Sequence, residues 1–306
     1  MRINSIILLS IISVFVNLLP VNAEIIGKDD FGRVIVLDKI PKRIVAVSAT
    51  LIPAIFEMGA GSKIVGVPEK IDLSYTWVCE KYPQVLDKPR VGGFSNINIE
   101  KIVSLSPDLV ILYDSLEAPG KYTQGFKKWG IPYASFGTAR DVSHGIEQIK
   151  RLGVLLGKKK EAENITKRIQ TENSKLQERV MPLSYKPLVY FWWGSGNLTY
   201  GKPTLVNELI EMAGGINLAG DINRQTPEIS HEYIISKDPD VIVITYWAEK
   251  DKKTRIAAIK EKPYFNQVKA IKNNRVYAID GSSVHSVVRF PEALRNLIKF
   301  IHPELQ

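Results

Sequence analysis

The sequence predicts an α/β fold of two similar lobes, each with a central, mostly parallel sheet, joined by one long helix. Three observations predict it: the second half of the chain repeats the first, the strand-like segments are apolar without alternation, and a polar helical stretch separates the repeats. The chain has 306 residues, of which 45% are hydrophobic and 24% charged. A chain of this length and composition can form two compact cores.

The internal repeat is visible in two pairs of segments. TLIPAIFEMGAGSKIVG, which begins at Thr50, returns without a gap as TLVNELIEMAGGINLAG from Thr204. EKIVSLSPDLVIL from Glu100 matches EYIISKDPDVIVI from Glu232. Both halves are therefore expected to follow one structural plan.

Each copy contains the elements of a parallel sheet. A strand (44–47 in the first copy, 188–191 in the second) leads into a short helix that ends at glycines. A second short helix ends before Pro107 or Pro239, because proline cannot continue it. The segments 109–112 and 241–244 are apolar without alternation, as in buried parallel strands joined by right-handed crossovers, and 276–279 is expected to be the last strand.

A long polar stretch lies between the two copies. Residues 158–180 place Ala162, Ile165, Ile169, Leu176 and Val180 near helical spacing, and Pro182 follows. A helix of that length spans about 30 Å, enough to bridge two lobes and to restrict them to a small closing rotation. The expected division is an N-terminal lobe of residues 24–156, a connecting helix within 157–182 and a C-terminal lobe of 183–306.

The first 23 residues predict a secretory signal peptide. Arg2 is followed by an apolar run, and Val21-Asn22-Ala23 has the small-residue pattern of a cleavage site, so cleavage is expected after Ala23. The chain has a single cysteine, Cys79, which excludes an intramolecular disulfide and lies far from the cleavage site. We therefore expect a periplasmic protein without a lipid anchor.

Composition and motifs argue against two other classes of protein. The net charge of +9 is scattered and forms no basic face interleaved with aromatic residues, so nucleic acid is not the expected partner. The glycines of GAGSKIVG (59–66) follow a helix and lack dinucleotide-binding spacing, and Trp193-Gly194-Ser195-Gly196 lacks the spacing of a nucleophile elbow. We do not expect an enzyme or a resident cofactor.

Longer motifs carry a family resemblance over almost all of the chain after residue 23. DDFGRVIVL, PKRIVAVS, EMGAGSKIVGV and PRVGGFSNINIEKIVSLSPDLVI occur in order, followed by GKPTLVNELIEMAGGINLAGD, ISHEYIISKDPDVIVI and NNRVYAIDG. This pattern resembles the siderophore, haem and vitamin B12 group of ABC-importer substrate-binding proteins, which have a helix between two lobes. The resemblance implies a monomeric receptor that delivers a metal chelate to an inner-membrane permease.

Two glutamates match the family's docking positions. Glu100 and Glu232 correspond to the glutamates that, in this family, lie on the lobe tips and engage arginines of the permease. Asn98 and Ser230 are good helix N-caps just before them. The alternative is that each carboxylate only stabilises the helix N-terminus.

The ligand is expected beyond the carboxyl ends of the parallel strands, where the two lobes face each other. Aromatic rings suit a flat or bulky chelate, and arginines can bind its carboxylate or catecholate oxygens. For each residue, core packing or a surface position is the alternative. The candidates follow the predicted strands or lie in predicted loops near the cleft. They are Phe94, Tyr113, Trp193, Tyr200, Tyr246, Trp247, Arg90, Arg140 and Arg289.

His285 lies in the segment GSSVHSVVRF, where the resemblance implies a direct iron ligand. His144 and His302 are expected at the surface. An iron(III)-siderophore is the expected ligand, with haem or cobalamin as alternatives in the same family. A receptor for bare zinc or manganese ions and an exported enzyme also stay open.

Overall fold

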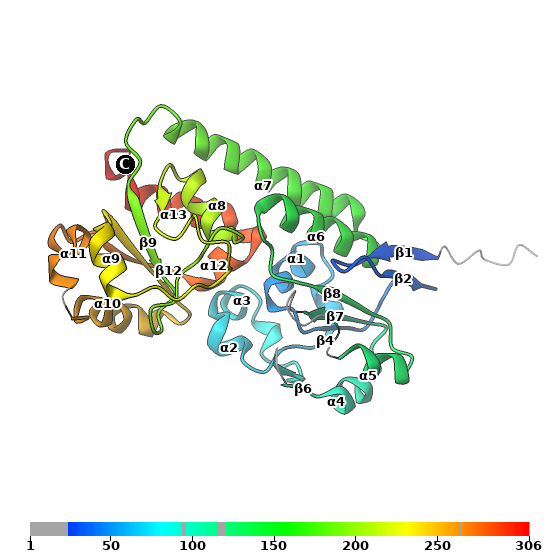
Figure 1. The fold of residues 1–306 in the computed structure, drawn as a ribbon. Coiled ribbons are helices and arrows are strands. Elements are labelled where there is room, and N and C mark those ends of the chain that lie inside the picture. Colours follow the sequence, from blue (N-terminus) through cyan, green and yellow to red (C-terminus); the bar gives the residue numbers. More distant parts are fainter. Residues whose placement is uncertain (1–23, 94–95, 115–119, 121, 264, 306) are drawn as a thin grey trace, which may run out of the picture.

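The computed structural model describes residues 24–93, 96–114, 120, 122–263 and 265–305. Two lobes lie side by side, and the helix α7 (Lys159–Val180) runs along both of them (Figure 1). The predicted fold class is confirmed. The predicted signal peptide, residues 1–23, lies outside the described residues.

The sheet of the N-terminal lobe has four parallel strands in the order β4-β3-β7-β8. Alternate residues of its strands enter different cores: Ile44 and Leu109 pack on one face, Val45 and Val110 on the other. Burial of both faces explains why these segments show no alternation in the sequence. The strands are β3 (Ile44–Ala46), β4 (Ile64–Gly66), β7 (Leu109–Tyr113) and β8 (Tyr133–Phe136).

The C-terminal lobe repeats this topology. Its parallel strands follow the order β10-β9-β11-β12, so in both lobes the order is second, first, third, fourth. The strand order reverses between the first and third strands of each sheet, and such a reversal opens a crevice at the strand ends. The strands are β9 (Leu188–Trp192), β10 (Ile216–Asn217), β11 (Val241–Tyr246) and β12 (Val276–Asp280).

Helices cover both sheets, and two short hairpins belong to the N-terminal lobe. The hairpin strands are β1 (Ile25–Lys28) with β2 (Val34–Leu37), and β5 (Gly92–Gly93) with β6 (Asn96–Ile97). The helices before α7 are α1 (Ile52–Glu57), α2 (Ile71–Ser74), α3 (Thr76–Lys81), α4 (Ile99–Ser104), α5 (Thr123–Lys128) and α6 (Val142–Leu155). Those after it are α8 (Leu205–Met212), α9 (His231–Lys237), α10 (Lys252–Lys260), α11 (Lys269–Lys272), α12 (Gly281–His285) and α13 (Phe290–Ile301).

The connecting helix α7 matches the predicted stretch to within one residue. Its apolar side, including Ile165, Ile169 and Leu176, is buried in a core that also contains residues of both sheets, while α6 and α13 pack along it. Gly153 of α6 allows this approach, because a Cβ there would lie 2.4 Å from the Cβ of Ala162. A core that extends through α7 into both lobes favours a small relative motion.

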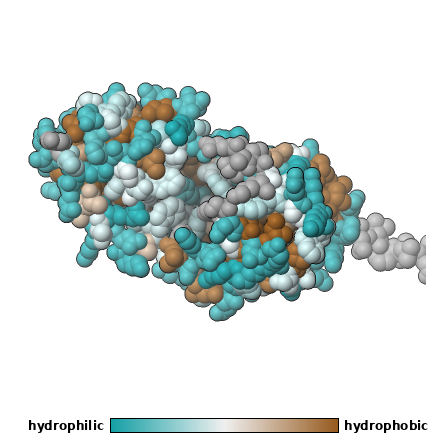
Figure 2. All heavy atoms as spheres, turned by 60° about the horizontal axis from the view of Figure 1, so that its bottom comes forward, coloured by the Kyte–Doolittle hydropathy of each residue, from teal (hydrophilic) through white to brown (hydrophobic). Residues whose placement is uncertain are grey.

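The face of the molecule in Figure 2 is hydrophilic over much of both lobes, with hydrophobic residues in separate patches. Among the helices of the described residues, none is both long and apolar enough to cross a membrane.

Candidate ligand-binding cleft

A cavity lies between the lobes at the points where both sheets reverse their strand order. Thr50 follows β3 and Tyr113 ends β7, the first and third strands of the N-terminal sheet. Trp193 and Trp247 follow β9 and β11, the corresponding strands of the C-terminal sheet. This is where open parallel sheets bind their ligands, so the repeat builds one cleft from two equivalent edges.

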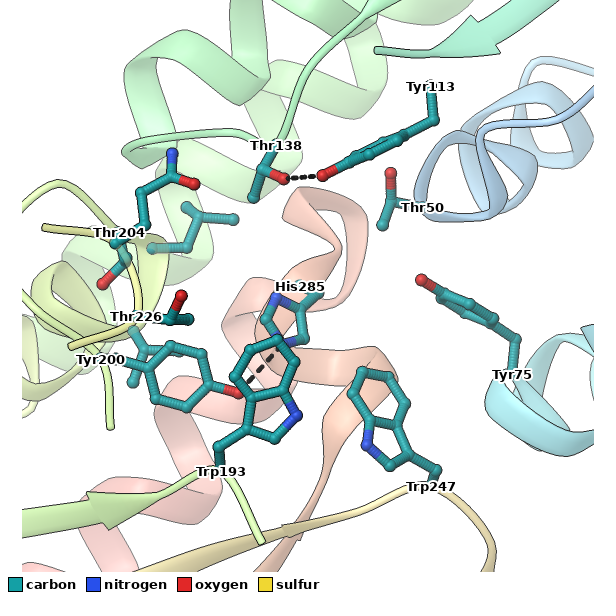
Figure 3. Close-up of a pocket in the computed structure, with 13 residues that line it drawn as sticks. Thr50, Tyr75, Tyr113, Thr138, Trp193, Tyr200, Thr204, Thr226, Trp247 and His285 are labelled. Carbon is teal, nitrogen blue, oxygen red and sulfur yellow. Dashed lines mark hydrogen bonds between the residues drawn. The ribbon is translucent and has the colours of Figure 1, made fainter. Parts of the chain in front are cut away.

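The cavity has a volume of about 390 Å³, within the range of small-molecule sites. Figure 3 shows its lining side chains pointing inward from both lobes. They are Thr50, Tyr75, Tyr113, Thr138, Trp193, Tyr200, Thr204, Leu205, Val206, Gln225, Thr226, Trp247 and His285.

Stacked rings form the wall of the C-terminal lobe. The rings of Trp193 and Tyr200 are parallel within 6°, with centroids 5.8 Å apart. Trp247 stacks on His285 with centroids 5.5 Å apart and planes 9° apart. A Cβ on Gly281 would lie 2.9 Å from the Trp247 ring, so this glycine lets the indole pack directly on the backbone of α12. The rings are therefore fixed before a ligand arrives.

Neutral polar groups complete the lining. Tyr113 Oη and Thr138 Oγ1 are 2.8 Å apart, and Tyr200 Oη lies 3.1 Å from His285 Nε2 (Figure 3). Burial lowers the pKa of His285 to about 4 and raises that of Tyr200 well above its usual value. The imidazole and the phenol are therefore both uncharged near neutral pH.

The lining set given above contains no carboxylate, ammonium or guanidinium group. Within the described residues, no group of three or more His, Cys, Asp and Glu side chains could hold a metal ion. The described part of the cleft thus offers ring faces and neutral hydrogen-bonding groups.

The structure brings together five of the residues predicted for the cleft, namely Tyr113, Trp193, Tyr200, Trp247 and His285. Phe94 lies outside the described residues.

Three other candidates do not line the cavity. Tyr246 ends β11, but its ring lies beside the ammonium of Lys252, 5.4 Å from the ring centroid. Arg90 donates from Nη1 to the carbonyl of Val85, at 3.2 Å. Arg140 is exposed just before α6.

Arg289 also lies outside the cleft lining, for a reason the sequence did not reveal. The segment after β12 folds into α12 and a 3₁₀ turn, Val287–Arg289. This turn buries the guanidinium between Asp280 and Glu292, with only 3% of the side chain exposed. Its face covers Trp77 of the opposite lobe, 4.1 Å from the ring centroid.

Several lining residues were not predicted from the sequence. Thr50 and Thr204 lie at matching positions of the internal repeat, so a signal for them was present. Tyr75 lies between α2 and α3, before the third strand of the N-terminal sheet. Among its described residues, the C-terminal lobe has no such helix pair before its third strand, so the internal repeat gave no signal for Tyr75. The others missed are Thr138, Leu205, Val206, Gln225 and Thr226.

The two predicted docking glutamates lie outside the cleft lining. Glu100 and Glu232 are exposed in the first turns of α4 and α9, the helices that lead into the third strand of each sheet. Asn98 and Ser230 cap these helices as predicted, each accepting a backbone N–H. Hydrogen bonds from its own backbone and from Ser230 lower the pKa of Glu232, which keeps it ionised.

Two histidines expected at the surface are instead largely buried. His302 is 1% exposed, with Nδ1 3.0 Å from a carboxylate oxygen of Glu304. His144 Nε2 lies 3.3 Å from a carboxylate oxygen of Asp30, which is itself buried.

Comparison with known proteins gives the family. Residues 44–282 match the family model described as periplasmic binding protein. An uncharacterized ABC transporter substrate-binding lipoprotein of Bacillus subtilis is 26% identical over 290 residues, covering 90% of this chain and 85% of the relative. A cobalamin-binding protein of Halobacterium salinarum is 26% identical over 280 residues, covering 90% of this chain and 73% of the relative.

A solved structure shows the same fold. The periplasmic heme-binding protein RhuT from Roseiflexus sp. RS-1 superposes with a TM-score of 0.74 at 22% identity, covering 87% of this chain and 99% of that protein. The family match over most of the chain agrees with the fold, which has two repeated sheets and a connecting helix. The chain belongs to the periplasmic binding protein family, whose members are substrate-binding proteins of ABC transporters and not enzymes.

Proposed function

We propose that this protein captures a bulky metal chelate in the interlobe cleft and delivers it to the permease of an ABC importer. One observation carries the proposal: five aromatic rings from both lobes surround a cavity whose described polar groups are neutral. Rigid rings give a large apolar contact at a small entropic cost, which suits a wide and flat ligand.

Among such ligands, cobalamin fits this lining best. Its corrin ring is broad, and its rim carries uncharged amides that can bond to threonine hydroxyls and to Gln225. Thr50 and Thr138 come from one lobe and Thr226 and Gln225 from the other, so amides on both sides of a bound corrin would find partners. The Halobacterium relative is named a cobalamin-binding protein, which supports the same choice.

An iron(III)-siderophore is the second candidate, and a different observation favours it. His285 Nε2 and the Tyr200 hydroxyl lie 3.1 Å apart in the cleft, and imidazole and phenol oxygen are both iron ligands. A chelate with open coordination sites could take these two atoms as ligands, the Tyr200 hydroxyl releasing its proton to solvent as the oxygen coordinates. The basic residues expected to bind an anionic siderophore, Arg90, Arg140 and Arg289, do not line the cavity, so a weakly charged chelate is the better match.

Delivery is proposed to use Glu100 and Glu232. They are exposed on topologically equivalent helices, one in each lobe, and outside the cleft lining. A pair of carboxylates on the two lobes could hold both lobes on a permease that presents arginines, through charge-assisted hydrogen bonds.

A thermal-shift panel with the purified protein tests the ligand class. The panel contains cyanocobalamin, haemin, a neutral ferric hydroxamate, an anionic ferric catecholate, and Zn²⁺ and Mn²⁺ salts. A ligand that binds only the folded state raises the melting temperature, and we expect cyanocobalamin to give the largest rise. Stabilisation by Zn²⁺ or Mn²⁺ alone would overturn the chelate proposal, and a larger rise with a ferric siderophore would reverse the order of the candidates.

A further inference from the structure

We propose that three successive residues of the N-terminal lobe, Tyr75, Thr76 and Trp77, act as an interlobe clasp. They would couple the occupancy of the cleft to the relative orientation of the lobes. In this role Thr76 and Trp77, which do not line the cavity, are positioning residues for Tyr75 and Trp247, which do.

The side chain of each of the three residues contacts the C-terminal lobe. The Tyr75 ring contacts the Trp247 ring, with centroids 6.0 Å apart and planes at 58°. Thr76 Oγ1 donates to the carbonyl oxygen of Trp247 at 3.2 Å. Trp77 lies under the guanidinium of Arg289, whose central carbon is 4.1 Å from the ring centroid. Side-chain, backbone and cation–π contacts therefore all fall on one short segment.

The partner side of the clasp is held firmly. Arg289 donates to Glu292 from Nε at 2.9 Å and from Nη2 at 2.6 Å, and it also pairs with Asp280. Such a bidentate arrangement fixes the guanidinium plane, and a fixed plane suits stacking on an indole. Trp247 is likewise held by its packing on Gly281. The C-terminal lobe thus presents two rigid surfaces to the segment.

The clasp lies between the ligand cleft and the connecting helix. Tyr75 and Trp247 line the cleft on one side. On the other side, Trp77 and Arg289 line a smaller cavity of about 120 Å³ together with Arg168 and Glu172 of α7.

Ion pairs tie α7 to both lobes at the same place. Arg168 pairs with Glu57 of α1, and Glu172 lies 3.5 Å from Arg295 of α13. A displacement of the Tyr75 and Trp247 rings by a ligand would therefore be passed directly to the contacts that set the lobe orientation.

Hydrogen–deuterium exchange tests the clasp without any ligand. The variant carries Thr76→Val, which removes the hydroxyl with almost no change in volume, and Trp77→Leu, which replaces the indole with a smaller apolar side chain. We expect faster exchange in residues 71–82 and also in 246–251 and 281–289 of the opposite lobe. Local destabilisation alone would speed exchange only in the N-terminal lobe, and that result would overturn the proposal.

Two matched variants sharpen this comparison. Thr76→Ser with Trp77→Phe keeps a hydroxyl and an aromatic ring, so it should restore most of the protection. Trp129→Leu changes a tryptophan of the same lobe that is 54% exposed at the end of α5, and it should leave all three segments unchanged.

A kinetic measurement tests whether the clasp affects ligand release, and only this measurement rests on the proposed function. Stopped-flow fluorescence with cyanocobalamin should show that the Thr76→Val, Trp77→Leu variant releases the probe about tenfold faster than the wild type, a change of about 1.4 kcal/mol. An unchanged release rate would contradict the coupling. If the wild type does not bind cyanocobalamin, the ligand assignment fails, and the exchange experiment still decides whether the clasp exists.

Discussion

Truncation of Trp247 to alanine is the most informative single change in the cleft. Its indole lines the cavity, stacks on His285 and contacts Tyr75 from the other lobe. The ring packs against the backbone at Gly281, so only part of its surface remains for a ligand. The change therefore removes an indole that lines the cavity and that contacts side chains of both lobes.

The expected loss can be worked out from area. A tryptophan side chain buries about 150–250 Å² in contacts, and taking about half of that surface as facing the ligand gives about 75–125 Å². At about 25 cal/mol per Å², loss of this contact weakens binding by about 2 kcal/mol. The dissociation constant for the chelate should therefore rise about 30-fold.

Isothermal titration of the purified variant with cyanocobalamin measures this change. Trp247→Phe keeps a ring and should lose much less affinity, while Trp129→Ala, outside the cleft lining, should lose none. Urea unfolding of each variant confirms that it is folded at the titration temperature. An affinity of a folded Trp247→Ala protein equal to that of the wild type would show that the ligand does not bind against this wall.

Three further predictions follow. Glu100→Arg with Glu232→Arg should abolish uptake in cells by placing like charges against the permease, while ligand affinity stays near the wild-type value; normal uptake would refute the docking role. Because burial lowers the pKa of His285 to about 4, the imidazole stays neutral and chelate affinity should be flat from about pH 5.5 to 8. A loss of affinity centred near pH 6.5 would contradict a buried, neutral imidazole. In the unfolded state the imidazole is protonated below about pH 6.5, so His285 makes the folded protein less stable as the pH falls from about 6.5 to 4. Small-angle scattering should show a monomer with only a small ligand-dependent change in radius of gyration, because α7 and its core connect both lobes; a large decrease would refute this.

The fold could be predicted because its signals are local. The absence of alternation in 109–112 and 241–244 follows from burial of both sheet faces, and the matched segments at Thr50 and Thr204 follow from the repeated topology. The rule for strand ends then located Tyr113, Trp193 and Trp247, because each ends or directly follows a central strand.

The rest of the cleft depends on information that a single sequence does not contain. Arg289 lies in the segment after the last strand, where ligand-binding residues were predicted. The turn after α12 instead places its guanidinium between two carboxylates and on the ring of Trp77. Tyr75 reaches the cleft from between α2 and α3, where it and Thr76 contact Trp247 of the other lobe. Long-range contacts of this kind leave no periodic pattern in the chain.

In our proposal, the aromatic cleft between the lobes binds a metal chelate. The most direct test is a calorimetric titration of the wild type and of a Trp193→Ala, Trp247→Ala double variant with cyanocobalamin. We predict that one ligand binds per wild-type monomer and that the folded double variant binds far more weakly, because it lacks both indole rings that line the cavity. Equal binding by both proteins would contradict the assignment of the cleft, and no binding by the wild type would contradict cobalamin as the ligand.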